Sequence, residues 1–239
     1  MDNNNIRTGL IVMLDMLGFK ERSTQMSDFI KVWQEFKQEV DKAVAALKID
    51  YDIEAGTLFL SDTILICLWS NNEESLENLL CGVPELIHSI FRTLIINESK
   101  IFLRGAMSYG EFLLDLEENI VMGPALNEAA EWYESTDWIG VILTPSAEFA
   151  LRSIIEDHKD TILDNTYIEY NIPFKVGFPR LCNYAVLWCL DRINSGVLVY
   201  PDLLKIFSKV PHSPRYSSKY VNTLKFIKEA NKIHDRLQD

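Results

Sequence analysis

The order of its hydrophobic patterns is the feature that most restricts how this chain can fold. Apolar residues spaced three and four apart predict amphipathic helices, and short runs of aliphatic and β-branched residues predict buried strands. Over the first 110 residues the two patterns follow one another in the segments 9–15 (strand), 27–47 (helix), 51–60 (strand), 63–69 (strand), 73–97 (helix) and 101–110 (strand). The predicted order is β-α-β-β-α-β, a split βαβ arrangement with one mostly antiparallel sheet.

The predicted fold class is therefore α+β, a ferredoxin-like sandwich with helices packed on one face of an antiparallel-rich sheet. Smaller elements are expected after it, in the segments 111–123 (hairpin), 124–133 (helix), 141–143 (strand), 145–158 (helix), 167–175 and 184–190 (strands) and 217–237 (helix). The sequence has no repeat and no long linker. We expect a single domain over 1–239, with a core over about 8–190 and a C-terminal helical extension over about 200–239.

Composition narrows the class of partners. The chain has 239 residues, 48% of them hydrophobic, which is enough to bury a sizeable core. Its net charge is −12 and it has no basic cluster, so we expect no nucleic-acid partner. The four cysteines show no CxxC pairing, which favours reduced thiols in the cytoplasm. The polar N-terminus is not a signal peptide, and no apolar run approaches a membrane span, so no membrane association is expected.

Two aspartates stand at the ends of predicted buried strands. Asp15 ends the apolar run LIVML, and Asp62 lies in the tight connection of LFLSDTILICLW. In a βαββαβ sheet the first strand lies beside this hairpin, so the two carboxylates can be neighbours. Paired carboxylates need a counter-charge, and their hard oxygens suit Mg²⁺ or Mn²⁺. The alternative is structural: Asp62 caps the turn and Asp15 caps the following helix.

Two further stretches carry polar residues in unusual positions. LRGAMSYGE places Arg104 inside an apolar strand, where a guanidinium needs an anionic partner. GPALNEAAEW places Asn127 on a short helix that starts just after a glycine.

Taken in order over residues 10–135, the stretches DMLGF, SDT, RGAMSYG and GPALNEAAE resemble the class III nucleotide cyclase domain, the adenylate and guanylate cyclase fold. In that family an acidic residue precedes Gly-Phe after the first strand, and a second acidic residue lies in the hairpin. An Arg-x-Gly motif follows on the fourth strand, and an asparagine lies on the next helix. The rest of the chain agrees with the family only in the general order of strands and helices.

The resemblance implies a metal-dependent lyase. Asp15 and Asp62 would bind two divalent ions, Mg²⁺ or Mn²⁺, with the Met16 carbonyl as a further candidate ligand. Arg104 would hold the phosphates of a nucleoside triphosphate, and Asn127 would orient the ribose across a dimer interface. The product would be a 3′,5′-cyclic nucleotide, released with pyrophosphate. Because the metal pair and the asparagine come from different chains in this family, the resemblance implies a homodimer with composite sites.

The chain departs from the purine-specific pattern at three positions. Leu58 and Ile120 stand where purine cyclases carry the polar residues that read the base, and neither can form a side-chain hydrogen bond. Glu131 stands where the family has an arginine that neutralises charge in the transition state. Another cation, Lys175 or Lys20, would then have to substitute, and Lys175 in IPFKVG matches a later phosphate-binding lysine of the family.

These departures resemble the bacterial pyrimidine nucleotide cyclases of anti-phage defence. Such stand-alone domains make cyclic UMP or cyclic CMP, which activates a separate effector. Phe19 of the DMLGF stretch would contact the nucleotide, and Tyr51 and Thr57 are candidates for reading the base. The expected function is a cytoplasmic pyrimidine cyclase acting on UTP or CTP, with uridylate cyclase favoured over cytidylate cyclase.

Three other interpretations stay open. An adenylate or guanylate cyclase could read a purine through main-chain groups despite Leu58 and Ile120. A non-catalytic, cyclase-like domain for nucleotide sensing or dimerisation would account for Glu131. An unrelated α+β domain would have a purely structural acidic pair.

Overall fold

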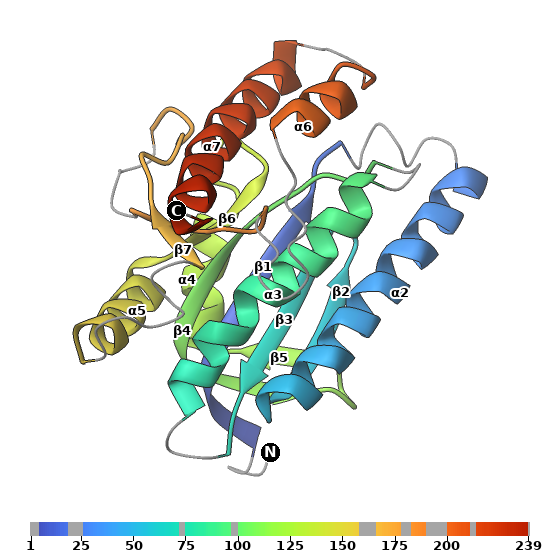
Figure 1. Cartoon of the computed structure of the whole chain (residues 1–239). Coiled ribbons are helices and arrows are strands. Elements are labelled where there is room, and N and C mark those ends of the chain that lie inside the picture. Colours follow the sequence, from blue (N-terminus) through green and yellow to red (C-terminus); the bar gives the residue numbers. More distant parts are fainter. Residues whose placement is uncertain are drawn as a thin grey trace.

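A computed structural model describes residues 5–18, 26–71, 75–96, 100–157, 166–177, 183–189, 200–210 and 214–238 (Figure 1). Its elements are β1 (Ile6–Met16), α2 (Met26–Tyr51), β2 (Glu54–Leu60), β3 (Thr63–Trp69), α3 (Ser75–Ile96), β4 (Leu103–Asp115), β5 (Ile120–Met122), α4 (Pro124–Trp132), β6 (Gly140–Leu143), α5 (Pro145–Asp157), β7 (Tyr167–Glu169), β8 (Tyr184–Val186), α6 (Tyr200–Phe207) and α7 (Pro214–Gln238). The first six follow the predicted β-α-β-β-α-β order, and the α+β class is confirmed.

The strands form one sheet in the order β2-β3-β1-β4-β6-β8-β7, and β5 pairs with β4. Strand β1 lies between β3 and β4 and is antiparallel to both. Strand β6 is parallel to β4. The central position of β1 matters for function, because the residues at its C-terminal end lie beside both the β2–β3 turn and the start of β4.

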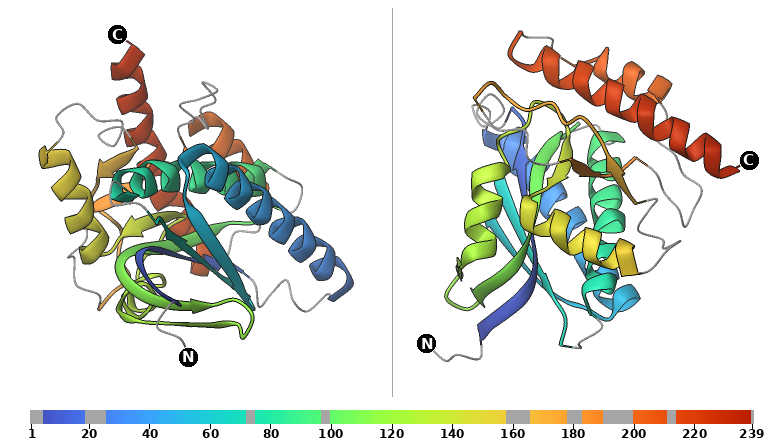
Figure 2. Two further views of the ribbon diagram at one scale, coloured as in Figure 1. Left: turned by 90° about the horizontal axis from the view of Figure 1, so that it is seen from below. Right: turned by 90° about the vertical axis from the view of Figure 1, so that its left-hand side faces the viewer.

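The two faces of the sheet are covered by different helices. Leu10, Val12 and Leu14 of β1 belong to the large core that packs against α2 and α3, whereas Ile11 points to the other face. There it belongs to a smaller core with residues of α4 such as Ala125. The right-hand view of Figure 2 shows α4 on the opposite side of the sheet from α2 and α3. The expectation of helices on one face therefore holds for α2 and α3 but is wrong for α4.

Helix α3 stays continuous although Pro84 lies in its interior. Proline has no backbone N–H, so the carbonyl of Leu80, one turn earlier, loses its usual donor. The hydroxyl of Tyr167, on β7, donates a hydrogen bond to that carbonyl at 2.7 Å. The buried backbone group is thus satisfied from the sheet, and the helix neither ends nor restarts at the proline.

Several predicted boundaries are wrong. Tyr51 was predicted to begin a strand but is the last residue of α2, and β2 begins at Glu54. The late strands are also shorter than predicted, since β7 and β8 cover three residues each. In these segments the apolar residues that follow the paired ones pack on the core but form no ladder with a neighbouring strand. The strands are therefore shorter than the apolar runs.

Two expectations from the sequence concern apolar runs and cysteines. Among the described residues one stretch, Leu76–Ile96 of α3, is long and apolar enough to cross a membrane, so the expectation that no apolar run approaches a membrane span is wrong. In the structure 67% of its most apolar window is buried, so its hydrophobicity is explained by packing in the core. Cys67 and Cys189 are free thiols, and Cys182 lies outside the described residues.

Candidate active site

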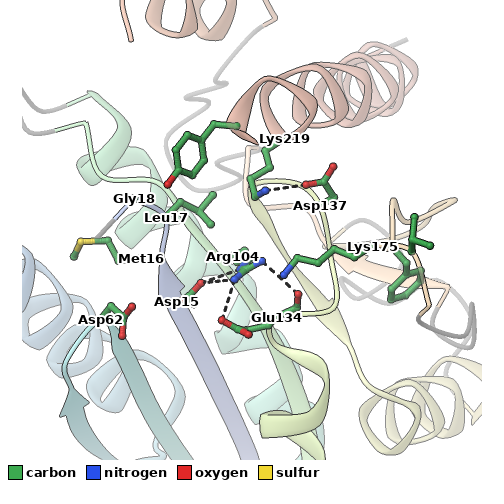
Figure 3. Close-up of a pocket in the computed structure, with 13 residues that line it drawn as sticks. Asp15, Met16, Leu17, Gly18, Asp62, Arg104, Glu134, Asp137, Lys175 and Lys219 are labelled. Carbon is green, nitrogen blue, oxygen red and sulfur yellow. Dashed lines mark hydrogen bonds and ion pairs between the residues drawn. The ribbon is translucent and has the colours of Figure 1, made fainter. Parts of the chain in front are cut away.

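The structure brings Asp15 and Asp62 to one cavity. In the β1–β3 ladder Asp15 pairs with Thr63, the residue that follows Asp62 in the hairpin turn. The main-chain N–H of Met16 donates to the carbonyl of Asp62 at 2.9 Å, which fastens the end of β1 to the turn. Both aspartates and Met16 line a cavity of about 540 Å³ (Figure 3). The predicted convergence of the two acidic residues is therefore present in the fold.

Arg104 lies across the sheet from Asp15 and pairs with it. The two residues are directly opposite in the β1–β4 ladder. The Arg104 Nε donates to Asp15 Oδ2 at 2.9 Å, and the Nη2–Oδ2 distance is 2.8 Å. Arg104 also contacts Glu134 Oε1 at 3.2 Å and donates to the carbonyls of Glu134 and Thr136 at 3.3 and 3.4 Å. The buried guanidinium has the anionic partners that its position in the sequence demands.

The pKa of the Asp15 carboxyl is raised by its surroundings. Its residue is 6% exposed. Burial raises the pKa of this carboxyl from 3.8 to about 6, although the Arg104 guanidinium opposes the rise. The negative charge of Asp62 adds to the increase. A cation held between the two carboxylates would relieve this repulsion.

A metal ion would find a fitting set of donors here. Among the described residues no group of three or more His, Cys, Asp or Glu side chains is placed to hold a metal. The candidate set is instead two carboxylates, Asp15 and Asp62, with the main-chain carbonyl of Met16. All three supply hard oxygen ligands, which Mg²⁺ and Mn²⁺ prefer over nitrogen or sulfur.

The cavity also has residues that sequence analysis missed. Glu134 and Asp137 come from the segment after α4, and Tyr216 and Lys219 come from α7. One signal existed for Lys219. It lies one turn before Thr223 and two turns before Phe226 on the buried face of α7, where a lysine needs a partner. Nothing in the sequence indicated that this face closes the cavity.

Lys175, one of the predicted residues, lies in the cavity wall. Its main-chain N–H donates to the carbonyl of Ser135 at 2.8 Å, which places it beside the loop that holds Arg104. Burial lowers the pKa of Lys175, and the neighbouring charge of Arg104 lowers it further. The structure therefore groups Lys175 with the two aspartates and Arg104.

The other predicted residues that the structure describes do not line this cavity. Asn127 and Glu131 lie on the exposed side of α4, and Ile120 is half-buried on β5. Leu58 is in the small core beneath α4, and Tyr51 lies at the opposite end of β2 from the Asp62 turn. Thr57 is half-buried on β2, and Phe19 and Lys20 lie outside the described residues.

Comparison with known proteins addresses the fold. No protein-family model matches the sequence, and no curated protein matches it. The adenylyl cyclase CyaB from P. aeruginosa has a similar structure, with a TM-score of 0.53 at 12% identity, over 80% of this chain and 97% of that one. A bacterial light-regulated adenylyl cyclase gives 0.48 at 14% identity, over 85% and 98%. The guanylate cyclase domain of RhGC from Catenaria anguillulae, in complex with GTP, gives 0.46 at 14% identity, over 75% and 96%.

The similarity to CyaB extends over nearly the whole of that domain, and at this level of identity it concerns the fold. It agrees with the four sequence stretches that resemble the cyclase pattern. The chain therefore has the fold of an adenylyl cyclase domain.

Proposed function

We propose that this protein is a metal-dependent nucleotide cyclase. The observation that carries the proposal is that Asp15 and Asp62, far apart in sequence, line one cavity at the end of the central strand of a cyclase-like sheet. The reaction joins the 3′-oxygen of a nucleoside triphosphate to its own α-phosphorus. The bond from that phosphorus to pyrophosphate breaks, and the 3′-hydroxyl proton leaves.

Different residues of the cavity would perform different parts of this reaction. Asp15, Asp62 and the Met16 carbonyl would hold divalent ions, Mg²⁺ or Mn²⁺, which supply Lewis acidity at the 3′-hydroxyl and the phosphates. Arg104 is held by Asp15 and Glu134 in the absence of substrate. Once Asp15 is engaged as a ligand, the guanidinium is available for the triphosphate, which it can bind bidentately. Lys175, which also lines the cavity, would contribute further positive charge.

The substrate that we favour is a pyrimidine nucleotide, UTP before CTP. Purine cyclases of this family bind the base through polar side chains. The side chains of Leu58 and Ile120, at the corresponding positions, have no hydrogen-bonding group. Leu58 is also only 6% exposed and lies in a hydrophobic core. In this proposal the protein is a cytoplasmic enzyme of bacterial antiviral defence, and its cyclic UMP or cyclic CMP acts on a separate effector.

The proposed enzyme is a homodimer with composite sites. Asn127, which resembles the ribose-orienting asparagine of the family, lies on the exposed side of α4 and does not line the cavity of its own chain. A second copy would have to bring its Asn127 to this cavity. Exposure of the residue on a short surface helix is what such an arrangement needs.

Two observations favour other functions. The similar solved structures are adenylyl and guanylyl cyclases, which supports a purine substrate. In the Arg104–Asp15 ion pair of the cavity wall, each charge is already balanced by the other. Glu131 also replaces an arginine of the family. These features favour a non-catalytic domain that senses nucleotides or dimerises.

One assay separates these functions. The protein is incubated with each of the four nucleoside triphosphates and Mn²⁺, and products are resolved by chromatography. A single cyclic pyrimidine supports the proposal, whereas cyclic AMP or GMP supports the purine cyclase. Nucleotide binding without turnover supports the sensing domain.

Substitution of Asp62 tests the metal assignment. Asp62→Ala should abolish turnover without unfolding the protein, because the bond to Met16 uses the backbone carbonyl of Asp62. Asp50→Ala, which removes an exposed carboxylate at the end of α2, is the matched control and should retain activity. Turnover by Asp62→Ala at the unchanged rate would show that the ions are held elsewhere.

A further inference from the structure

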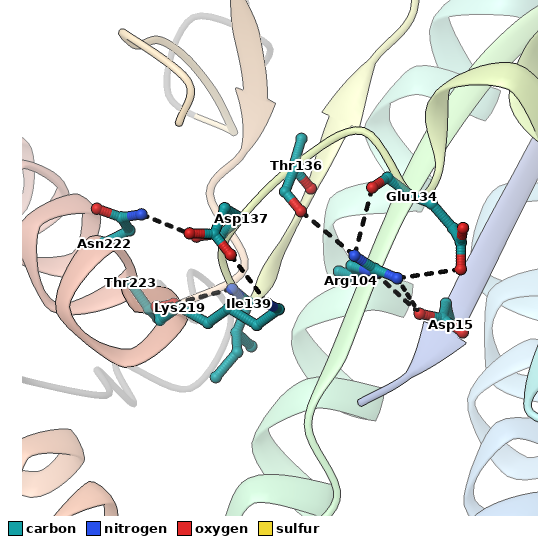
Figure 4. Close-up of polar contacts among 9 residues, drawn as sticks. All are labelled: Asp15, Arg104, Glu134, Thr136, Asp137, Ile139, Lys219, Asn222 and Thr223. Carbon is teal, nitrogen blue, oxygen red and sulfur yellow. Dashed lines mark hydrogen bonds and ion pairs between the residues drawn. The ribbon is translucent and has the colours of Figure 1, made fainter. Parts of the chain in front are cut away.

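A lysine of the C-terminal helix closes one side of the cavity. Lys219 of α7 is 9% exposed, and its Nζ donates to Asp137 Oδ1 at 2.9 Å (Figure 4). Burial raises the pKa of the Asp137 carboxyl, but hydrogen bonds from Lys219 and Ser218 outweigh it and hold that pKa below its usual value. The Asp137 carboxylate therefore favours its ionised form. Both residues also line the cavity that contains Asp15 and Asp62.

Helix α7 is fixed firmly against this wall. The hydroxyl of Thr223 accepts a hydrogen bond from the main-chain N–H of Ile139 at 2.8 Å, and Asn222 Nδ2 donates to the Asp137 carbonyl at 2.9 Å. The Phe226 ring packs edge-on against Trp138 at 4.7 Å between centroids. These contacts hold the backbone around Lys219 in one position, so its ammonium group reaches the cavity with little loss of conformational entropy.

The cavity brings several cationic side chains together in a chain whose net charge is −12. Among the described residues, three cations and four carboxylates line it, namely Arg104, Lys175, Lys219, Asp15, Asp62, Glu134 and Asp137. With every group ionised the lining carries −1, and two divalent ions at the aspartates would make it +3. Burial is the largest cause that lowers the pKa of Lys175, and the neighbouring charges of Arg104 and Lys219 lower it further. Lys175 therefore lies close enough to both cations to be repelled by them. A bound polyanion would relieve that repulsion.

We propose that Lys219 is a triphosphate-binding residue of this cavity, and that Asp137 holds its ammonium group until the anion arrives. The inference rests on the proposed cyclase function and adds to it a ligand group that lies outside the four stretches resembling the family. It supplies positive charge to the cavity of a chain whose Glu131, on the exposed side of α4, replaces an arginine of the family. Lys219 then exchanges one oxygen partner, the carboxylate of Asp137, for another on the phosphate chain.

The test uses the full-length protein and inorganic tripolyphosphate with Mn²⁺, measured by titration calorimetry. Lys219→Met should weaken tripolyphosphate binding roughly tenfold, the effect of losing one charge-assisted hydrogen bond. Lys219→Arg should retain most of the affinity. Asp137→Asn is the matched control, because it breaks the same ion pair but leaves the lysine and removes a negative charge from the wall. Its affinity should be unchanged or higher.

The two variants also separate binding from docking of α7. If Lys219→Met and Asp137→Asn weaken tripolyphosphate binding equally, the ion pair only holds the helix and the proposal is wrong. If Lys219→Met does not fold, Lys219→Gln takes its place in the same comparison. The KM for the preferred nucleotide should rise in Lys219→Met in proportion to the lost affinity. If tripolyphosphate binding depends on Lys219 but no nucleotide is turned over, this inference holds and the cyclase proposal is wrong. If nucleotides are cyclised with an unchanged KM in Lys219→Met, the cyclase proposal holds and this inference is wrong.

Discussion

Replacing Asp15 with asparagine should stabilise the metal-free protein at neutral pH, although it removes a partner of a buried arginine. A carboxyl group whose pKa is higher in the folded protein than in the unfolded chain binds its proton more tightly in the folded state. As pH rises between the two values, the folded state must give up a proton that it holds favourably, and stability falls. Asparagine resembles the neutral carboxylic acid and carries no such penalty.

The magnitude follows from the pKa of Asp15, which burial raises from 3.8 to about 6. The ionised group then costs about 3 kcal/mol at pH 7.5 and about half as much near pH 5. Arg104 is not left without partners in the variant, because Glu134 and the carbonyl of Thr136 remain within 3.4 Å of it. The asparagine oxygen can still accept from the guanidinium.

The assay is urea denaturation of wild-type protein and Asp15→Asn in EDTA at pH 7.5 and pH 5. We expect a higher free energy of unfolding for the variant, with the gain shrinking at the lower pH. Asp62→Asn serves as the control, since this half-buried turn residue should give a smaller gain. A variant less stable than wild type at pH 7.5 would show that the Asp15–Arg104 pair is net favourable and that burial is not the dominant effect.

Three more predictions concern the metal, α7 and the central strands. Mn²⁺ affinity, measured by titration calorimetry, should fall up to tenfold per pH unit below about pH 6, because a proton on Asp15 competes with the ion. Thr223→Val should lower the free energy of unfolding by about 1–3 kcal/mol, because the buried N–H of Ile139 loses its acceptor, and Thr223→Ser should restore it. Gly105→Ala should lower the melting temperature and weaken Mn²⁺ binding, because its Cβ would lie 2.2 Å from the Met13 carbonyl oxygen and force β1 from β4. Unchanged melting of Thr223→Val or Gly105→Ala would contradict the packing described here.

The sequence predicted much of the framework, because its main elements bury a continuous apolar face. In α2, Phe36, Val40, Val44 and Leu47 recur at helical spacing, and all are buried against the sheet. The βαββαβ order then leaves few ways to arrange four strands, and this is why Asp15 and Asp62 could be predicted as neighbours. Boundaries were less predictable, as Tyr51 shows, because a helix end and a strand start can share apolar residues.

Only the tertiary structure decided what surrounds the two aspartates. Periodicity indicates which face of an element is buried, but not which distant element it meets. The sequence indicated that Arg104 needs an anionic partner. The register of the β1–β4 ladder places Asp15 opposite it. Lys219 is not singled out by the sequence analysis, and only the docking of α7 on the loop around Asp137 buries this lysine and places it in the cavity. The described residues that line the site come from six separate segments, so its composition depends on packing between them, and no local pattern carries that information.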